Sequence, residues 1–97
     1  MIIQFVRLKS ALTEEVLLKR ANERKPAFEA LPGLIQKYYL KLDEPGQYAG
    51  LYIWDSAESL MAFQGTELAK SIPEAYEVTQ APNIELLNVL FQLRNPS

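Results

Sequence analysis

The residues best suited to chemistry in this sequence are aromatic, and they lie in the stretch 50–54, GLYIW. Tyr52 and Trp54 are two positions apart in an apolar segment, so in a strand both side chains project from one face. Gly50 lies on the same face and leaves room beside the two rings. Aromatic walls with a few uncharged polar groups are typical of a small-molecule pocket. Ordinary core packing, with the polar tips hydrogen-bonded, is the alternative.

The chemistry open to such a pocket is limited by composition, because the 97 residues include no cysteine and no histidine. Disulfides and the Ser-His and Cys-His nucleophile pairs are therefore excluded. Zinc, copper and haem iron lack their usual ligands, so we expect neither a metal nor a cofactor.

Ionisable side chains near the predicted sheet are few. Arg7 could stabilise a phenolate, although an ion pair at a strand end is the more common role of such a residue. Lys37 and Lys41 are typical of solvated edge charges that discourage aggregation. Asp43 in a turn and Asp55 at a helix start both have structural explanations, so neither is assigned to catalysis.

The net charge of −2 argues against a nucleic-acid partner, because phosphate binding needs a concentrated basic face. Basic residues in 19–25 are interleaved with acidic ones, as on a solvated helix. No apolar run approaches the ~18 residues of a membrane span, and the first residues do not form a secretory signal. We expect a cytoplasmic protein with no membrane partner.

The elements that would position these residues form one domain over 1–97. Strands are expected over 2–8, 34–42, 47–54 and 84–93. Thr13 should cap the first helix, Pro26 should kink or restart it, and Pro32-Gly33 should end it. Pro45-Gly46 suits the centre of a type II turn between the second and third strands.

The second half of the chain is expected to add one main helix and the last strand. Asp55 should cap that helix, with Glu58 completing a box, and Gly65 should end it. Thr66 can cap a further short turn, whereas residues 72–83 are expected to be mostly irregular and 95–97 to be a frayed tail. The order is βαββαβ, a ferredoxin-like α+β fold with a four-stranded antiparallel sheet.

Both faces of this sheet are apolar, although helices can cover only one of them. The predicted first and last strands carry apolar residues on both sides. We expect the compact residues Ala49, Leu51 and Ile53 to face the helices, and Tyr48, Gly50, Tyr52 and Trp54 to face away. The economical cover for the second face is another copy of the chain, sheet against sheet, which predicts a homodimer.

Two short motifs in this frame resemble the dimeric α/β-barrel superfamily, which includes the antibiotic-biosynthesis monooxygenases. They are Trp54-Asp55-Ser56 followed by Leu60, and Pro32-Gly33-Leu34-Ile35 at the start of the second strand. The resemblance is strongest to the short mono-oxygenase members. It implies that two ferredoxin-like subunits pair their sheets and that each encloses a cavity near Trp54 and Gly50. Monooxygenase members carry an asparagine where this chain has Gly50, and many relatives carry a histidine where it has Phe63.

The resemblance implies a cofactor-independent monooxygenase acting on a small phenol- or quinol-like aromatic in a cavity between sheet and helices. The alternative is a non-catalytic small-molecule-binding or stress-related protein, and an isomerase or lyase would need a general base that the sequence does not reveal. Trp54→Ala should impair any activity. Catalytic residues stay unassigned, and the candidate pocket-lining residues are Gln4, Tyr38, Gly50, Tyr52, Trp54, Phe63 and Asn88.

Overall fold

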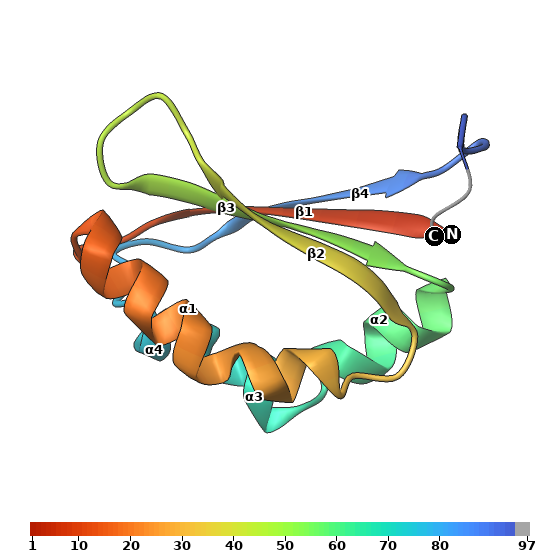
Figure 1. Cartoon of the computed structure of the whole chain (residues 1–97), viewed down its shortest axis with the longest axis horizontal. Helices are drawn as coiled ribbons and strands as arrows, with labels where there is room; N and C mark the ends of the chain where they lie inside the picture. The colour runs from red at the N-terminus through yellow and green to blue at the C-terminus, as the bar shows by residue number, and fades with distance from the viewer. Residues whose placement is uncertain (95–97) are drawn as a thin grey trace.

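The computed structural model describes residues 1–94 and has one antiparallel sheet with every described helix on the same side (Figure 1). The strands lie in the order β2-β3-β1-β4, which confirms the predicted ferredoxin-like α+β arrangement. The strands are β1 (Ile2–Lys9), β2 (Leu34–Lys41), β3 (Gln47–Trp54) and β4 (Asn83–Asn88). The helices are α1 (Glu14–Glu29), α2 (Ala57–Gln64), α3 (Glu67–Lys70) and α4 (Ile72–Ala75). Within residues 1–94, no helix is both long and apolar enough to cross a bilayer.

Helix α1 begins as predicted, since the Thr13 side chain accepts a hydrogen bond from the Val16 amide at 3.4 Å. Its buried stripe is Leu17, Ala21 and Phe28. The helix continues through Pro26 as one element instead of restarting there. A proline removes only one helical hydrogen bond, and the burial of Phe28 beyond it holds the last turn against the sheet.

The β2–β3 turn is confirmed, because the Gln47 amide donates to the Glu44 carbonyl at 3.2 Å and Gly46 has φ +79°. The predicted cap of α2 is wrong by one residue. Ser56, not Asp55, accepts from the amide three residues on, that of Ser59, at 3.2 Å. Asp55 instead accepts hydrogen bonds from two serine hydroxyls, as described below.

The C-terminal predictions are partly wrong. β4 ends at Asn88 instead of residue 93, because its pairing partner β1 begins at Ile2 and Met1 offers one last acceptor, to the Val89 amide at 3.1 Å. Part of the segment expected to be irregular forms the short helix α4. The predicted tail, 95–97, lies outside the described residues.

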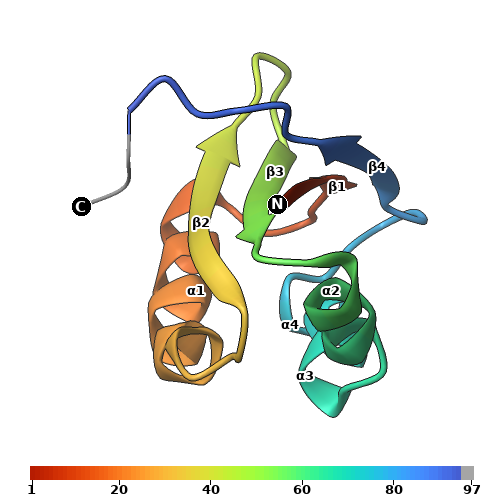
Figure 2. The ribbon, with the colours of Figure 1, turned by 90° about the vertical axis from the view of Figure 1, so that its right-hand side faces the viewer.

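The prediction of which side of the sheet faces the helices is also wrong. Tyr52 and Trp54 lie under the helices, in a buried cluster with Phe28, Leu60 and Phe63. The opposite face carries Leu51 and Ile53, whose partners across the sheet include Phe5 and Ile3. Figure 2 shows this second face without a covering helix. Both rows are apolar, so alternation alone could not choose between them, and the larger aromatic side chains occupy the deeper space under the helices.

Candidate functional site

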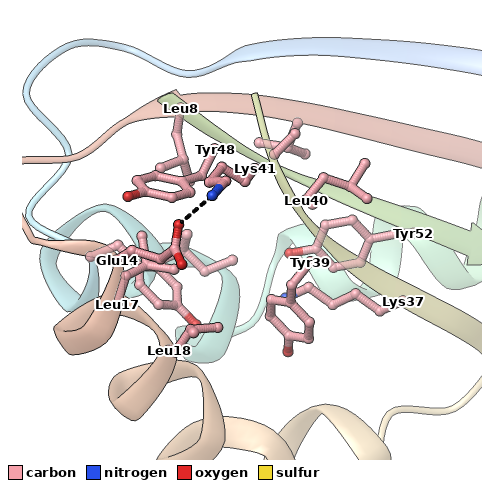
Figure 3. A pocket seen from close by; sticks show the side chains of 15 residues that line it. Leu8, Glu14, Leu17, Leu18, Lys37, Tyr39, Leu40, Lys41, Tyr48 and Tyr52 are labelled. Atoms are coloured by element: carbon pink, nitrogen blue, oxygen red, sulfur yellow. Dashed lines mark ion pairs between the residues drawn. The ribbon is translucent and has the colours of Figure 1, made fainter. Parts of the chain in front are cut away.

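A cavity of about 190 Å³ lies between the sheet and helix α1 (Figure 3). An apolar cavity of ~150 Å³ can hold benzene, so this space is suited to one substituted aromatic ring. Its walls come from β1, β2, β3, α1, α4 and Tyr76. The apolar lining residues are Val6, Leu8, Leu17, Leu18, Leu40, Ala49 and Ile72.

Gly50 forms part of the cavity wall at the middle of β3. A Cβ atom at this position would lie 3.2 Å from Tyr52 Cε1 and 3.5 Å from Lys37 Cε. Its neighbours across the sheet are Val6 and Tyr39, which both line the cavity. A side chain at position 50 would therefore take up space between Tyr52 and Lys37.

Besides Gly50, Tyr52 is the one candidate residue that lines this cavity. Gln4, Trp54 and Phe63 lie behind it in the core. Trp54 is 0% exposed and stacks on Tyr52, with ring centroids 6.1 Å apart and an interplanar angle of 4°. Its Nε1 donates to Gln4 Oε1 at 3.0 Å, which pairs two buried polar groups. Phe63 packs 5.2 Å from Trp54, between centroids. These contacts match the core-packing alternative for Trp54.

The two remaining candidates lie elsewhere. Tyr38 is 50% exposed and lies opposite Leu51, on the sheet face without helices. Asn88 is exposed at the end of β4, opposite Ile2. Neither residue lines the cavity.

Lys37 lines the cavity, although its sequence context suggested a solvated edge charge. Its Nζ lies 3.6 Å from the ring centroid of Phe28, 4.4 Å from that of Tyr39 and 4.5 Å from that of Tyr52. Burial, with a smaller contribution from the positive charge of Arg24, lowers the pKa of Lys37 to about 7. The side chain is thus close to the balance between ammonium and free amine at neutral pH.

Tyrosine hydroxyls supply the other polar groups of the cavity. Burial raises the pKa of Tyr39 to about 12 and raises that of Tyr52 further. Burial also raises the pKa of Tyr76, against the opposing effect of the nearby Arg24 guanidinium. All three hydroxyls stay protonated at neutral pH and can donate hydrogen bonds to a ligand.

Two cavity tyrosines lie outside β3, and Tyr76 is the more buried of them, with 5% of its surface exposed. Sequence patterns did not reveal Tyr76 as a cavity residue. Among residues 1–94 neither its hydroxyl nor the adjacent Arg24 Nε has a hydrogen-bond partner of good geometry, although the Arg24 guanidinium is close enough to the hydroxyl to lower its pKa. Arg24 is anchored by its Nη2, which donates to the Leu68 carbonyl at 3.2 Å and to Ser71 Oγ at 3.0 Å. An unpartnered buried hydroxyl on a cavity wall is a group that a bound ligand could satisfy.

The other two cationic candidates have different surroundings. Lys41 also lines the cavity, but its Nζ forms an ion pair with Glu14 at 3.1 Å (Figure 3). Arg7 lies on a different surface, with its guanidinium 5.1 Å from the Phe5 ring centroid. In residues 1–94, no group of three or more Asp, Glu, Cys or His side chains could hold a metal ion.

The two motifs that carry the family resemblance meet outside the cavity. The Asp55 amide donates to the Gly33 carbonyl at 2.8 Å, and the Asp55 carboxylate accepts from Ser59 Oγ at 2.6 Å and Ser56 Oγ at 3.1 Å. These hydrogen bonds lower the pKa of Asp55, and the one from Ser59 has the largest effect. Gly33 has φ +79°, and a Cβ there would lie 2.2 Å from Ser59 Oγ. This junction fixes the start of β2 against the start of α2 and is a structural feature.

The fold and the cavity together define a class: a ferredoxin-like domain with a small, aromatic-walled cavity between its sheet and its helices. Comparison with solved structures is consistent with this class. A protein of unknown function from Nitrosomonas europaea is 21% identical, with a TM-score of 0.79 over 99% of this chain and 94% of its own. A protein from Caulobacter crescentus, described provisionally as an antibiotic biosynthesis monooxygenase, is 26% identical, with a TM-score of 0.70 over 93% and 90%.

SnoaB, described as a cofactor-independent oxygenase from Streptomyces nogalater, is 13% identical, with a TM-score of 0.74 over 97% of this chain and 98% of its own. No family model matches the sequence, and no curated protein does. The chain has the fold of the antibiotic biosynthesis monooxygenase-like ferredoxin-fold superfamily, which confirms the resemblance seen in the two motifs.

Proposed function

We propose that the chain is a cofactor-independent monooxygenase that acts on a small phenol- or quinol-like aromatic in the cavity between the sheet and α1. The observation that carries the proposal is the cavity itself, of about 190 Å³, with aromatic walls and tyrosine hydroxyls. The fold shared with SnoaB, described as a cofactor-independent oxygenase, gives further support. The volume favours a single substituted ring over a fused three-ring compound.

In such a reaction the ionised, electron-rich substrate itself reduces oxygen. The ring supplies all four electrons, so that a phenol gives a quinone: one oxygen atom replaces a ring hydrogen, and the other leaves as water with that hydrogen and the hydroxyl hydrogen. The protein has to hold the ring away from bulk water and stabilise the oxyanion. Tyr52 and Tyr76 line the cavity, and we assign them as donors of hydrogen bonds to that oxyanion; Leu17 and Ile72 provide apolar walls.

Oxygen uptake by the chelator-treated protein, measured with single-ring quinols and phenols, tests the proposal. Gly50→Val should abolish uptake by filling space beside Tyr52, whose Cε1 would lie 3.2 Å from the first added carbon. Gly65→Ala is the matched control, because its added Cβ would meet only the Ala62 carbonyl, at 3.7 Å. Uptake that is unchanged in folded Gly50→Val would place the reaction outside this cavity. Trp54→Ala is a poor probe of the site, since truncating this buried ring should cost ~3–5 kcal/mol of stability.

A second candidate function is ligand binding without turnover. The absence of an acidic side chain on the cavity wall other than Glu14, which is paired with Lys41, favours it. This alternative predicts saturable binding of single-ring phenols, blocked in Gly50→Val, with no oxygen uptake above that of the buffer.

We also propose that a second copy of the chain covers the open sheet face. Apolar side chains meet there without helices over them, with Leu51 opposite both Phe5 and Tyr38. Beyond β4, Leu90 is 94% exposed, which adds apolar surface that a partner could bury. Leu51→Glu should yield monomers in sedimentation equilibrium, whereas Met61→Glu, at a 67% exposed apolar position on α2, should sediment like the wild type. A wild-type monomer would contradict this assembly.

A further inference from the structure

We propose that the cavity binds its ligand as a phenolate, with the side-chain amine of Lys37 accepting the proton of the ligand hydroxyl group. The inference rests on the proposed function for the class of ligand, a single-ring phenol. It assigns the proton-accepting group that the sequence did not reveal.

The position of Lys37 is the first argument. Figure 3 shows its side chain running between Tyr39 and Tyr52 into the cavity. Its Nζ lies within 3.6–4.5 Å of the ring centroids of Phe28, Tyr39 and Tyr52. Among the described residues it has neither an ion pair nor a hydrogen-bond acceptor. A lysine amine that reaches a cavity without a carboxylate partner is free to interact with the ligand.

The charged groups around Lys37 allow the amine to be neutral before the ligand binds. Arg24, on α1, opposes a second positive charge, and burial opposes it more strongly. Lys25 and Glu29, also on α1, line a surface hollow that Lys37 shares, and their opposite charges largely offset one another there. The aromatic faces around Nζ attract an ammonium ion, so the protonated state formed by the transfer is also tolerated.

The phenolic groups facing Lys37 reinforce the assignment. Tyr39, Tyr52 and Tyr76 all have raised pKa values, so they stay protonated and do not compete for the role of base. The buried Tyr76 hydroxyl, close to the Arg24 guanidinium, is suited to an anionic oxygen. The step balances as a single proton transfer: the ligand O–H bond breaks, an N–H bond forms on Lys37, and an ammonium–phenolate pair results with no change in oxidation state.

Lys41 lines the same cavity but is not assigned the role of base. Its ammonium is paired with Glu14 at 3.1 Å and its side chain is 69% exposed. The Lys41 amine is therefore already held by a carboxylate, whereas that of Lys37 is not. The control is a lysine away from the cavity: Lys70, exposed on α3, does not line it, so Lys70→Met should leave the ionisation state of the bound ligand unchanged.

Binding of 4-cyanophenol, whose anion absorbs at longer wavelength than the neutral phenol, tests the inference at about pH 7.5, where the free ligand is mostly neutral. The wild type and Lys70→Met should bind it with the phenolate spectrum and release no proton to the buffer, as measured by calorimetry in buffers of different ionisation enthalpy. Lys37→Met should bind it as the neutral phenol, about tenfold more weakly or worse, since one pKa unit corresponds to a tenfold change. Lys37→Arg, which supplies a charge but accepts no proton, should bind phenolate and release one proton.

A neutral phenol bound to the wild type, no binding at all, or a phenolate spectrum in Lys37→Met would each overturn the assignment. Oxygen uptake separates this result from the proposed function. Phenolate binding without uptake of oxygen would leave the role of Lys37 intact and reject the monooxygenase. Oxygen uptake without a phenolate spectrum would reject the role of Lys37 and leave the monooxygenase proposal intact.

Discussion

Replacing Gly33 with alanine should destabilise the protein about three times as much as the same change at Gly46. Both glycines have φ +79°, a conformation that costs an alanine about 1 kcal/mol. They differ in surroundings. A Cβ on Gly46 would have one close neighbour, the Ser10 carbonyl oxygen at 3.4 Å, whereas a Cβ on Gly33 would lie 2.2 Å from Ser59 Oγ and 2.7 Å from Asp55 Oδ1.

The extra cost at Gly33 follows from what has to move. Ser59 cannot stay where it is: its hydrogen bond to Asp55 is lost, and forcing an added methyl group into occupied space typically costs about 1–3 kcal/mol. Adding the backbone term gives about 3 kcal/mol for Gly33→Ala and about 1 kcal/mol for Gly46→Ala. For a domain of this size, these values correspond to decreases in Tm of about 15 °C and about 5 °C.

Urea unfolding of both variants, followed by circular dichroism, measures the difference directly. Gly33→Ala in a Ser59→Ala background should recover part of the loss, since the nearest obstructing atom is then absent. Equal destabilisation of the two single variants would refute the steric argument and leave only the backbone term.

Three further predictions concern titration and the core. Between about pH 7 and pH 10.5 the unfolded chain holds a proton on Lys37 that the folded protein lacks, so the free energy of unfolding should rise with pH across this range. Lys37→Met should remove that slope and be more stable near pH 7 by ~4 kcal/mol, since each pKa unit corresponds to ~1.4 kcal/mol; urea titrations at several pH values can check this. Trp54→Phe should cost ~3 kcal/mol, because it removes ring volume and leaves Gln4 Oε1 buried without its donor; in a double-mutant cycle Gln4→Met should then cost less than in the wild type. Hydrogen bonds lower the pKa of Asp55 in the folded protein, so its contribution to the free energy of unfolding is present above the ordinary pKa of 3.8 and is lost as the pH falls through the folded-state pKa. In an acid titration, the stability of Asp55→Asn should therefore decline less steeply than that of the wild type.

The elements that depend on local sequence could be predicted well. Strand β3 was expected over the observed residues because its limits are set by the Pro45-Gly46 turn and by the start of the next helix. The end of β4 could not be predicted in this way. Residues after Asn88 are as apolar as those before it, and the strand ends because β1 provides no further partner beyond Met1. The end of β4 is thus set by its pairing with β1, which cannot be read from the residues of β4 alone.

The cavity was harder to predict than the fold, since its polar groups come from places where local rules point elsewhere. A lysine on an edge strand is ordinarily solvated, but the helix side of β2 lies against α1, and Lys37 is held among aromatic rings. Tyr76 follows a short helix that begins with Ile72-Pro73 and has no detectable period. Its burial depends on Arg24 and Ser10, which are distant in sequence.

The motifs that carry the resemblance and the residues that surround the cavity are largely separate sets. Hydrogen bonds among Gly33, Asp55 and Ser56 join β2 to α2 away from the cavity. They can therefore be the same in proteins that bind different substrates. The cavity, in contrast, is defined by Lys37 and Tyr76, which lie outside those motifs. Similarity in the motifs therefore supports a shared architecture, whereas the chemistry of the ligand has to be argued from the cavity walls. Those walls, apolar with one near-neutral amine and protonated phenols, are suited to a small ring that carries one acidic hydroxyl group.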